Sequence, residues 1–277
     1  MAINYASKYS SLVDERFKTG ALTAGILNNN YDWLGVETVV VYGIPTSELN
    51  DYTLTGASRY GTPAELQNTK QELTVGQDRA FTFTIDKKSE QDTVGVMQAG
   101  AALRREIDEV VIPEVDTYRI ATLASGAKSG HVIEDTAVAK DNAYEKFLTG
   151  QGLLDDAKVP QGGRFALITP AFYNMLKLSA DFIKKGDMAQ NIAINGVVGE
   201  VDGVYIIKAP ASYFPAKVHC IITNNMVMPS PVKLNEYKIH QDPPGINGWL
   251  VEGRIRYDAF ILNNKADAIA VIKNPAS

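Results

Sequence analysis

Hydrophobic and polar side chains alternate through Gly248–Leu262, near the C-terminus of the chain. One parity holds Trp249, Val251, Ile255, Tyr257, Ala259 and Ile261, and the other holds Glu252, Arg254, Arg256 and Asp258. A period of two is typical of a strand with one buried face. Such a strand would be roughly 45 Å long at about 3.3 Å per residue, about twice the usual strand length. The pattern predicts an elongated subunit that gains its partners by assembly.

The same alternation returns over Gln71–Asp86, where Gly76–Arg79 indicates a turn between two strands. A valine-rich run, Glu37–Ile44, predicts another strand. The stretch around Asn50–Leu66 contains Gly and Tyr and is too long to bury itself, so we expect a projecting loop that packs on another surface. Before these elements, Ser11–Thr19 predicts either a short amphipathic helix or an extended arm.

A long helix is expected after the second alternating segment. Ser89 is followed three residues later by a carboxylate, which is a helix-capping signature. Helical spacing of apolar residues then continues from Glu90 to about Leu123, roughly 50 Å at 1.5 Å per residue if unbroken. Pro113 is expected to kink or end this helix, because its ring clashes with the carbonyl of Glu109.

The second half of the chain has an alternating pattern of helices and strands, and it begins after a small-residue linker at Ser125–Gly130. The predicted elements are a helix over Asp141–Lys158, a buried strand at Phe165–Ile168, a helix after Pro170, a hairpin over Val197–Lys208 that turns at Asp202 and Gly203, and a strand at His219–Thr223. A proline-rich connection, residues 229–244, leads to the long C-terminal strand, and Ala268–Ile272 is a last apolar run.

Charge and composition exclude several classes of protein. Lys and Arg total 27 against 32 Asp and Glu, a net charge of −5, so the whole chain has no electrostatic reason to bind nucleic acid. The single cysteine, Cys220, excludes an intrachain disulfide and a cysteine-based zinc site. No signal-peptide pattern and no run of about 20 apolar residues is present, so we expect an unprocessed intracellular product without a membrane segment.

No catalytic, metal or cofactor site is predicted. The three histidines, His131, His219 and His240, lack metal-ligand spacing. His219 and Cys220 are neighbours on a strand and point to opposite faces, which disfavours a nucleophile pair. The glycines at 20 and 25 have the spacing of a phosphate loop, but Ile and Leu follow where Lys and Ser or Thr are needed.

Candidate residues for contacts between subunits come from the loop and the strands. Arg59 and Tyr60 combine a multi-donor cation with an aromatic ring, as interface hot spots do. Arg254 and Arg256 share one face of the long strand, where they either pair with carboxylates of another subunit or keep an edge soluble. The remaining candidates are aromatic residues of the alternating strands: Phe81, Phe83 and Trp249.

The order of these elements resembles the major capsid protein of tailed bacteriophages with the Hong Kong 97-type fold, in particular those of phages and prophages of Gram-positive bacteria. The segments that carry the resemblance are Asp51–Leu66, Gln77–Thr93, Arg164–Leu176 and Gly248–Ile269. The resemblance implies an α+β fold. Its parts would be an N-terminal arm (1–35), an extended loop with flanking strands (36–88), a peripheral-domain spine helix (89–130), an α/β axial domain (131–240) and a return to the peripheral domain with long C-terminal strands (241–277).

The same resemblance implies a non-enzymatic shell protein. Pentamers and hexamers of the chain would form an icosahedral head in the bacterial cytoplasm, around double-stranded DNA bound without sequence specificity. A separate scaffolding protein, a portal and head accessory proteins would be its other partners, with no membrane. Some relatives carry a Lys–Asn isopeptide cross-link, for which Lys70 and Asn263 or Asn264 are the conceivable partners. The alternatives are an encapsulin-type nanocompartment shell around cargo enzymes, and an enzyme of another type, which would need a convergent polar site.

Overall fold

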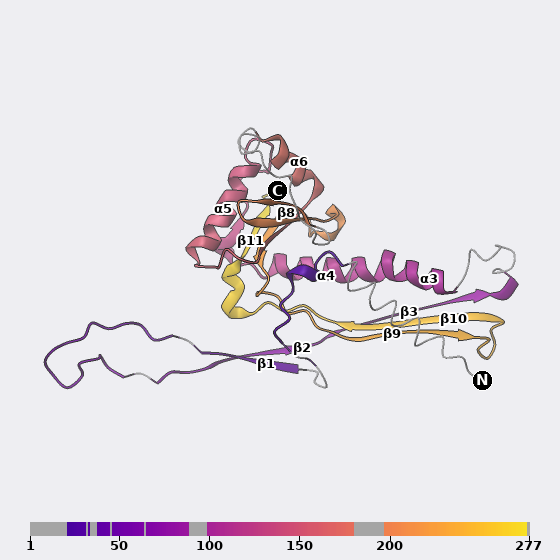
Figure 1. Cartoon of the computed structure of the whole chain (residues 1–277), viewed down its shortest axis with the longest axis horizontal. Helices are drawn as coiled ribbons and strands as arrows, with labels where there is room; N and C mark the ends of the chain where they lie inside the picture. The colour runs from indigo at the N-terminus through magenta and orange to yellow at the C-terminus, as the bar shows by residue number, and fades with distance from the viewer. Residues whose placement is uncertain are drawn as a thin grey trace.

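The computed structural model of the chain describes residues 21–31, 33, 38–44, 46–63, 65–88, 99–179 and 197–275. The expected N-terminal helix or arm before residue 21 and the expected helix cap at Ser89 lie outside these residues. The molecule is elongated (Figure 1): a long helix runs above a narrow sheet, an α/β body covers one end of the helix, and a two-stranded ribbon with a long loop projects away from both.

The narrow sheet has three antiparallel strands in the order β3-β10-β9. Their bounds are β3 (Gln77–Asp86), β9 (Val232–Gln241) and β10 (Gly248–Tyr257). The predicted alternation in β10 is confirmed, since Val251, Ile255 and Tyr257 are buried while Glu252 and Arg254 are exposed. The strand is shorter than predicted and ends at Tyr257. The next amide, that of Asp258, donates to the carbonyl of Pro231 instead of continuing the pairing, and the chain turns away from the sheet.

Strand β9 was not predicted, because the segment between Pro229 and Pro244 was interpreted as a connection. The prolines in fact flank the strand and leave its interior free of proline, which a paired strand requires. The sheets also divide the chain differently from the predicted ranges 131–240 and 241–277. Strand β9 belongs to the narrow sheet, whereas the last strand, β11 (Ile269–Lys273), belongs to the α/β body.

The long helix consists of α3 (Ala99–Glu106), a single π turn labelled η2 (Ile107–Val111) and α4 (Ile112–Ser125). Pro113 was expected to kink or end the helix, and the helix does not end there. In the π turn the amide of Ile112 donates to the carbonyl of Ile107, five residues back, so the hydrogen-bond register changes directly before the proline. Pro113 thereby occupies the first turn of α4, where its missing N–H costs nothing.

One face of this helix packs on the narrow sheet. Its buried residues follow a spacing of four: Leu103, Ile107, Val111 and Val115. They pack against the strand residues whose side chains face the helix, which include Ile85, Tyr237, Val251, Ile255 and Tyr257. Helix and sheet therefore form a single two-layer unit with one hydrophobic core.

The α/β body contains a six-stranded mixed sheet in the order β4-β11-β8-β5-β7-β6. Its strands are β4 (Val132–Ile133), β5 (Arg164–Ile168), β6 (Val197–Val201), β7 (Val204–Lys208), β8 (Val218–Asn224) and β11. One face packs against α5 (Ala143–Asp156) and α6 (Pro170–Leu178), and the other against α4. The predicted helices, hairpin and strands of this half are confirmed, including the turn at Asp202 and Gly203, both with positive φ. The described residues also contain short 3-10 turns: η1 (Ala24–Ile26), η3 (Ser129–His131), η4 (Ala211–Tyr213) and η5 (Asn263–Ala268).

The projecting ribbon pairs β1 (Thr38–Gly43) with β2 (Thr69–Thr74) in antiparallel register. The predicted strand over Glu37–Ile44 is thus confirmed. The turn expected at Gly76–Arg79 lies two residues earlier, and it does not form a hairpin, because β2 and β3 belong to different sheets. The chain turns this corner at Val75 and Gly76.

Candidate assembly surface

The loop between β1 and β2 exposes large apolar side chains. Residues 46–63 contain no helix or strand, and Figure 1 shows the loop extending far from the rest of the molecule. Leu49 is 101% exposed, Leu54 81% and Tyr60 84%. Scattered single apolar residues are normal on a protein surface, but a projecting segment that presents several of them together marks an interaction site.

The tip of the loop is organised by its own hydrogen bonds. The amide of Thr53 donates to the carbonyl of Arg59 (3.1 Å), and the Arg59 Nε donates to the carbonyl of Gly56 (3.3 Å). The ring of Tyr60 packs edge-on against that of Tyr52, with 5.0 Å between centroids. Arg59 and Tyr60, both predicted as interface residues, therefore lie side by side on a partly preorganised tip, which lowers the entropy lost on docking.

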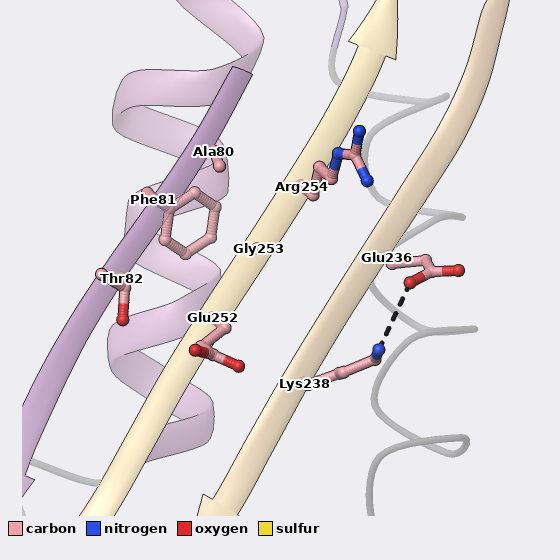
Figure 2. A pocket seen from close by; sticks show the side chains of 8 residues that line it. All are labelled: Ala80, Phe81, Thr82, Glu236, Lys238, Glu252, Gly253 and Arg254. Carbon is pink, nitrogen blue, oxygen red and sulfur yellow. Dashed lines mark ion pairs between the residues drawn. The ribbon is translucent and has the colours of Figure 1, made fainter. Parts of the chain in front are cut away.

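The outer face of the narrow sheet is charged, and Figure 2 shows the side chains around a shallow hollow of about 430 Å³ on it. Arg254 makes two hydrogen bonds to Asp78, Nε to Oδ1 at 2.9 Å and Nη2 to Oδ2 at 2.6 Å. This contact lowers the pKa of the Asp78 carboxyl and raises that of the guanidinium. Glu236 and Lys238 form another ion pair at 3.4 Å. Arg254 therefore has a carboxylate partner within its own chain.

Arg256, the second predicted arginine, is also engaged within the chain: its Nη2 donates to the carbonyl of Val75 at 3.0 Å. The sequence correctly placed both arginines on one face of β10. It could not identify their partners, because Asp78 and Val75 lie more than 170 residues earlier in the chain.

The three aromatic candidates lie on the opposite face. Phe81, Phe83 and Trp249 are partly buried against the core between the sheet and the long helix. Phe81 lies over Gly253, which has no side chain to displace it, and its centroid is 6.0 Å from that of Tyr237. These rings therefore contribute to the core of the chain more than to its outer surface.

A buried polar cluster connects the N-terminal segment to α4. Asp116 and Arg119 are both almost completely buried. Asp116 accepts hydrogen bonds from the amide of Leu22 (2.9 Å) and the hydroxyl of Thr23 (2.6 Å). Arg119 Nη1 donates to the same hydroxyl (3.1 Å), and its Nε donates to Ser230 Oγ (2.9 Å). Burial lowers the pKa of Arg119 to about 10, and the neighbouring Asp116 opposes this shift.

Asp258 lies where β10 ends and, like Asp116, its carboxylate holds segments that are distant in the sequence. Its carboxylate accepts from the Tyr118 hydroxyl, the Gly76 amide and the Ala259 amide, each at 2.8 Å. Burial, followed by the hydrogen bond to Asp258, raises the pKa of Tyr118. Neither set of contacts was predicted: Asp116 is a polar residue in a largely apolar stretch of helix, and Asp258 lies on the polar parity of its strand pattern, so neither position indicates its partners.

The described residues contain no group of three or more His, Cys, Asp or Glu side chains that could hold a metal ion. Cys220 is fully buried, and desolvation raises the pKa of its thiol far above the ordinary value.

A groove of about 530 Å³ lies beside α4 and η4, and the Arg79–Glu114 ion pair (2.7 Å) is at its edge. Within the part of the chain that the structure describes, no helix is long and apolar enough to cross a membrane.

By sequence, no family model and no curated protein matches the chain. Solved structures do match it. A protein of Mycobacterium phage Che8 is similar over 90% of this chain and 89% of its own, with 14% identity and a TM-score of 0.70. The capsid structure of cyanophage P-SCSP1u gives 91% and 86% coverage, 12% identity and a TM-score of 0.68.

The chain has the Hong Kong 97-type fold. The predicted α+β fold class is thereby confirmed. A virus-like particle from Pyrococcus furiosus shares this fold as well, over 98% of this chain and 100% of its own, with 12% identity and a TM-score of 0.59.

Proposed function

We propose that this chain is the major capsid protein of a tailed phage or prophage of a Gram-positive host, a structural protein without catalytic activity. The observation that carries the proposal is the projecting loop, whose exposed Leu49, Leu54 and Tyr60 need a covering surface outside the subunit. In this function copies of the chain assemble as pentamers and hexamers into an icosahedral shell. A closed shell gives each loop a neighbouring copy to dock on.

Within this proposal Arg59 and Tyr60 are the central contact residues. They are exposed, adjacent and held by the hydrogen bonds of the loop tip. Arg254 and Arg256 contribute at the rim of a contact, since their intrachain partners already satisfy them. Phe81, Phe83 and Trp249 act indirectly, by packing the sheet against the long helix.

The shell would enclose double-stranded DNA without binding it through a dedicated site. Phosphate binding needs cations that are free to replace counterions. Many cations of this chain are paired with carboxylates instead: Lys70–Glu72, Arg79–Glu114, Lys87–Asp242, Lys128–Asp267, Lys146–Asp135, Arg164–Asp155, Arg254–Asp78 and Lys273–Glu134. With a net charge of −5, such a surface favours weak, non-specific contact with the genome.

The same function implies assembly in the host cytoplasm, location in the virion, and further partners: a scaffolding protein, a portal and head accessory proteins. The second candidate is an encapsulin-type compartment shell that encloses enzymes. It stays as an alternative because of the match to the virus-like particle from Pyrococcus furiosus, but the phage structures match with higher TM-scores (0.70 and 0.68 against 0.59) and favour the first candidate.

The first test is negative-stain electron microscopy with light scattering, on the purified chain alone and co-expressed with its genomic neighbours. Closed shells of uniform size support the proposal, and DNA or enzyme cargo inside separates the two candidates. A chain that stays monomeric under both conditions refutes both.

A loop variant makes the test specific. Burying Leu54 and Tyr60 is worth roughly 1.5–3 kcal/mol for each side chain, so Leu54→Ser with Tyr60→Ser should raise the concentration needed for assembly more than about tenfold. Tyr60→Phe is the matched control, because it keeps the ring. Trypsin provides a second readout, since Arg59 is the only basic residue between positions 44 and 69: free subunits should be cut there and assembled ones protected.

A further inference from the structure

The base of the projecting ribbon is fixed to the segment that joins the two sheets. After β10 the chain runs through residues 258–262 to η5 and then to β11 in the α/β body. Strand β2 and its following corner lie along this segment, as three contacts show: the amide of Gly76 donates to Asp258 Oδ2 (2.8 Å), Arg256 donates to the carbonyl of Val75, and Gln71 contacts residues 261 and 263.

Gln71 makes the outermost of these contacts. Its Nε2 donates to the carbonyl of Ile261 at 2.8 Å, and its Oε1 accepts from the amide of Asn263 at 3.0 Å. One side-chain amide thus satisfies both backbone groups that flank Leu262. This is the pair of bonds that a neighbouring strand would make, so the glutamine acts as a one-residue substitute for strand pairing.

Gln71 shares the inward side of β2 with the buried Leu73, and the buried Val75 follows directly after the strand. These form a small hydrophobic cluster with Leu262 and Trp33, and the Trp33 ring stacks on Phe260 at 5.4 Å between centroids and 12° between planes. The cluster alone would hold the base of the ribbon in place but leave its angle free, since apolar contacts are not directional. The two hydrogen bonds of Gln71, further out along the ribbon, are directional and fix an angle.

We propose that Gln71 is the residue that sets the direction in which the ribbon and its loop project from the subunit. Gln71 binds the segment that also links the narrow sheet to the α/β body. The direction of the ribbon therefore depends on how the narrow sheet and the α/β body are placed. This inference rests on the proposed function for its consequence: the direction of the ribbon decides where the loop meets a neighbouring copy in a shell.

The variant that tests it is Gln71→Leu, which keeps the size and apolar contacts of the side chain and removes both hydrogen bonds. The matched control is Glu72→Gln. Glu72 is the next residue of the same strand, points to the other side and pairs with Lys70 on the exposed surface. Both variants keep the buried cluster, so both should fold.

The direction of the ribbon is measured in the unassembled subunit by pulsed electron paramagnetic resonance, which gives the distance between two spin labels. One label is attached at Ser58→Cys, at the loop tip, and the other at Thr82→Cys, on the exposed face of β3. The native Cys220 is buried and does not take up label. We expect one distance distribution in the parent and in Glu72→Gln, and a broader, shifted one in Gln71→Leu. The Asn263 amide should also exchange with deuterium about five- to tenfold faster in Gln71→Leu, as the loss of its acceptor implies.

An unchanged distribution in Gln71→Leu, or equal broadening in Glu72→Gln, would overturn the inference. In assembly reactions Gln71→Leu should increase the share of open or irregular particles. If the parent forms no shells at all, the proposed function fails, while the distance measurement still decides the role of Gln71.

Discussion

Gly253 lies in the middle of β10, where a side chain would normally stabilise a strand. A Cβ built at this position would lie 2.3 Å from both Cε1 and Cζ of Phe81 and 2.9 Å from Cδ1 of Tyr237. These distances are far below van der Waals contact, so Gly253→Ala must push the Phe81 ring out of its place between strand and helix. The substitution therefore tests whether the close approach of this ring determines the residue at 253.

The magnitude follows from three effects. Forcing extra volume into a packed site costs about 1–3 kcal/mol, and disturbing the Phe81–Tyr237 pair costs about 0.5–1.5 kcal/mol. Replacing a strand glycine returns roughly 0.5–1 kcal/mol of chain entropy. We expect a net loss of about 0.5–4 kcal/mol in the free energy of unfolding, measured by urea denaturation of the unassembled chain as a lower midpoint at unchanged slope.

Gly152 in α5 provides the matched control, since a Cβ added there meets nothing within 4 Å. Gly152→Ala should stabilise the subunit by up to about 1 kcal/mol. A double-mutant cycle with Phe81→Ala should reveal coupling, because removing the ring removes the clash. Effects of Gly253→Ala and Phe81→Ala that add within about 0.5 kcal/mol would refute the reasoning.

Three further results are expected. Asp258→Asn keeps the shape of the anchor but removes its charge, so thermal unfolding of the subunit should show a loss of about 1–3 kcal/mol, and an unchanged midpoint would contradict the role of the carboxylate. The lowered pKa of Asp78 means that its pairing with Arg254 contributes above the unfolded-state pKa and is lost as the pH falls through the folded value; NMR titration of Asp78 should show this lowered pKa, and Arg254→Ala should remove most of the shift, leaving the smaller effect of Arg256. Cys220 should react with a thiol reagent only on unfolding, and rapid reaction of the native subunit would show that β8 opens locally.

Local patterns in the sequence were sufficient for most elements. The alternation in β10 correctly separated Val251 and Ile255 from Glu252 and Arg254, because the period of a strand depends only on which face is buried. The helix after Thr169 was equally predictable from the sequence. Its start is defined by Pro170 and by the Thr169 hydroxyl, which accepts a hydrogen bond from the Phe172 amide.

Contacts between distant segments were not accessible. Nothing near Leu22 indicates that its amide binds Asp116, 94 residues later, and nothing near Gln71 indicates Ile261. The length of β10 was overestimated for the same reason. The parity continues to Ile261, but the strand ends at Tyr257, because Asp258 is held by Gly76 and Tyr118 from other parts of the chain.

The order of strands in the two sheets has a consequence for how the protein is made. Strand β3 ends at Asp86 but its neighbour β10 begins only at Gly248, and β4 pairs with β11, the last strand of the chain. At translation rates of about 5–20 residues per second, β10 is synthesised roughly 10–30 s after β3, so β3 stays without its partner strand for that time. Neither sheet is complete until almost the whole chain has been synthesised. Under the proposed function, a nascent chain can therefore offer other copies the early β1–β2 ribbon, but the narrow sheet and the α/β body are finished only once β10 and β11 have been made.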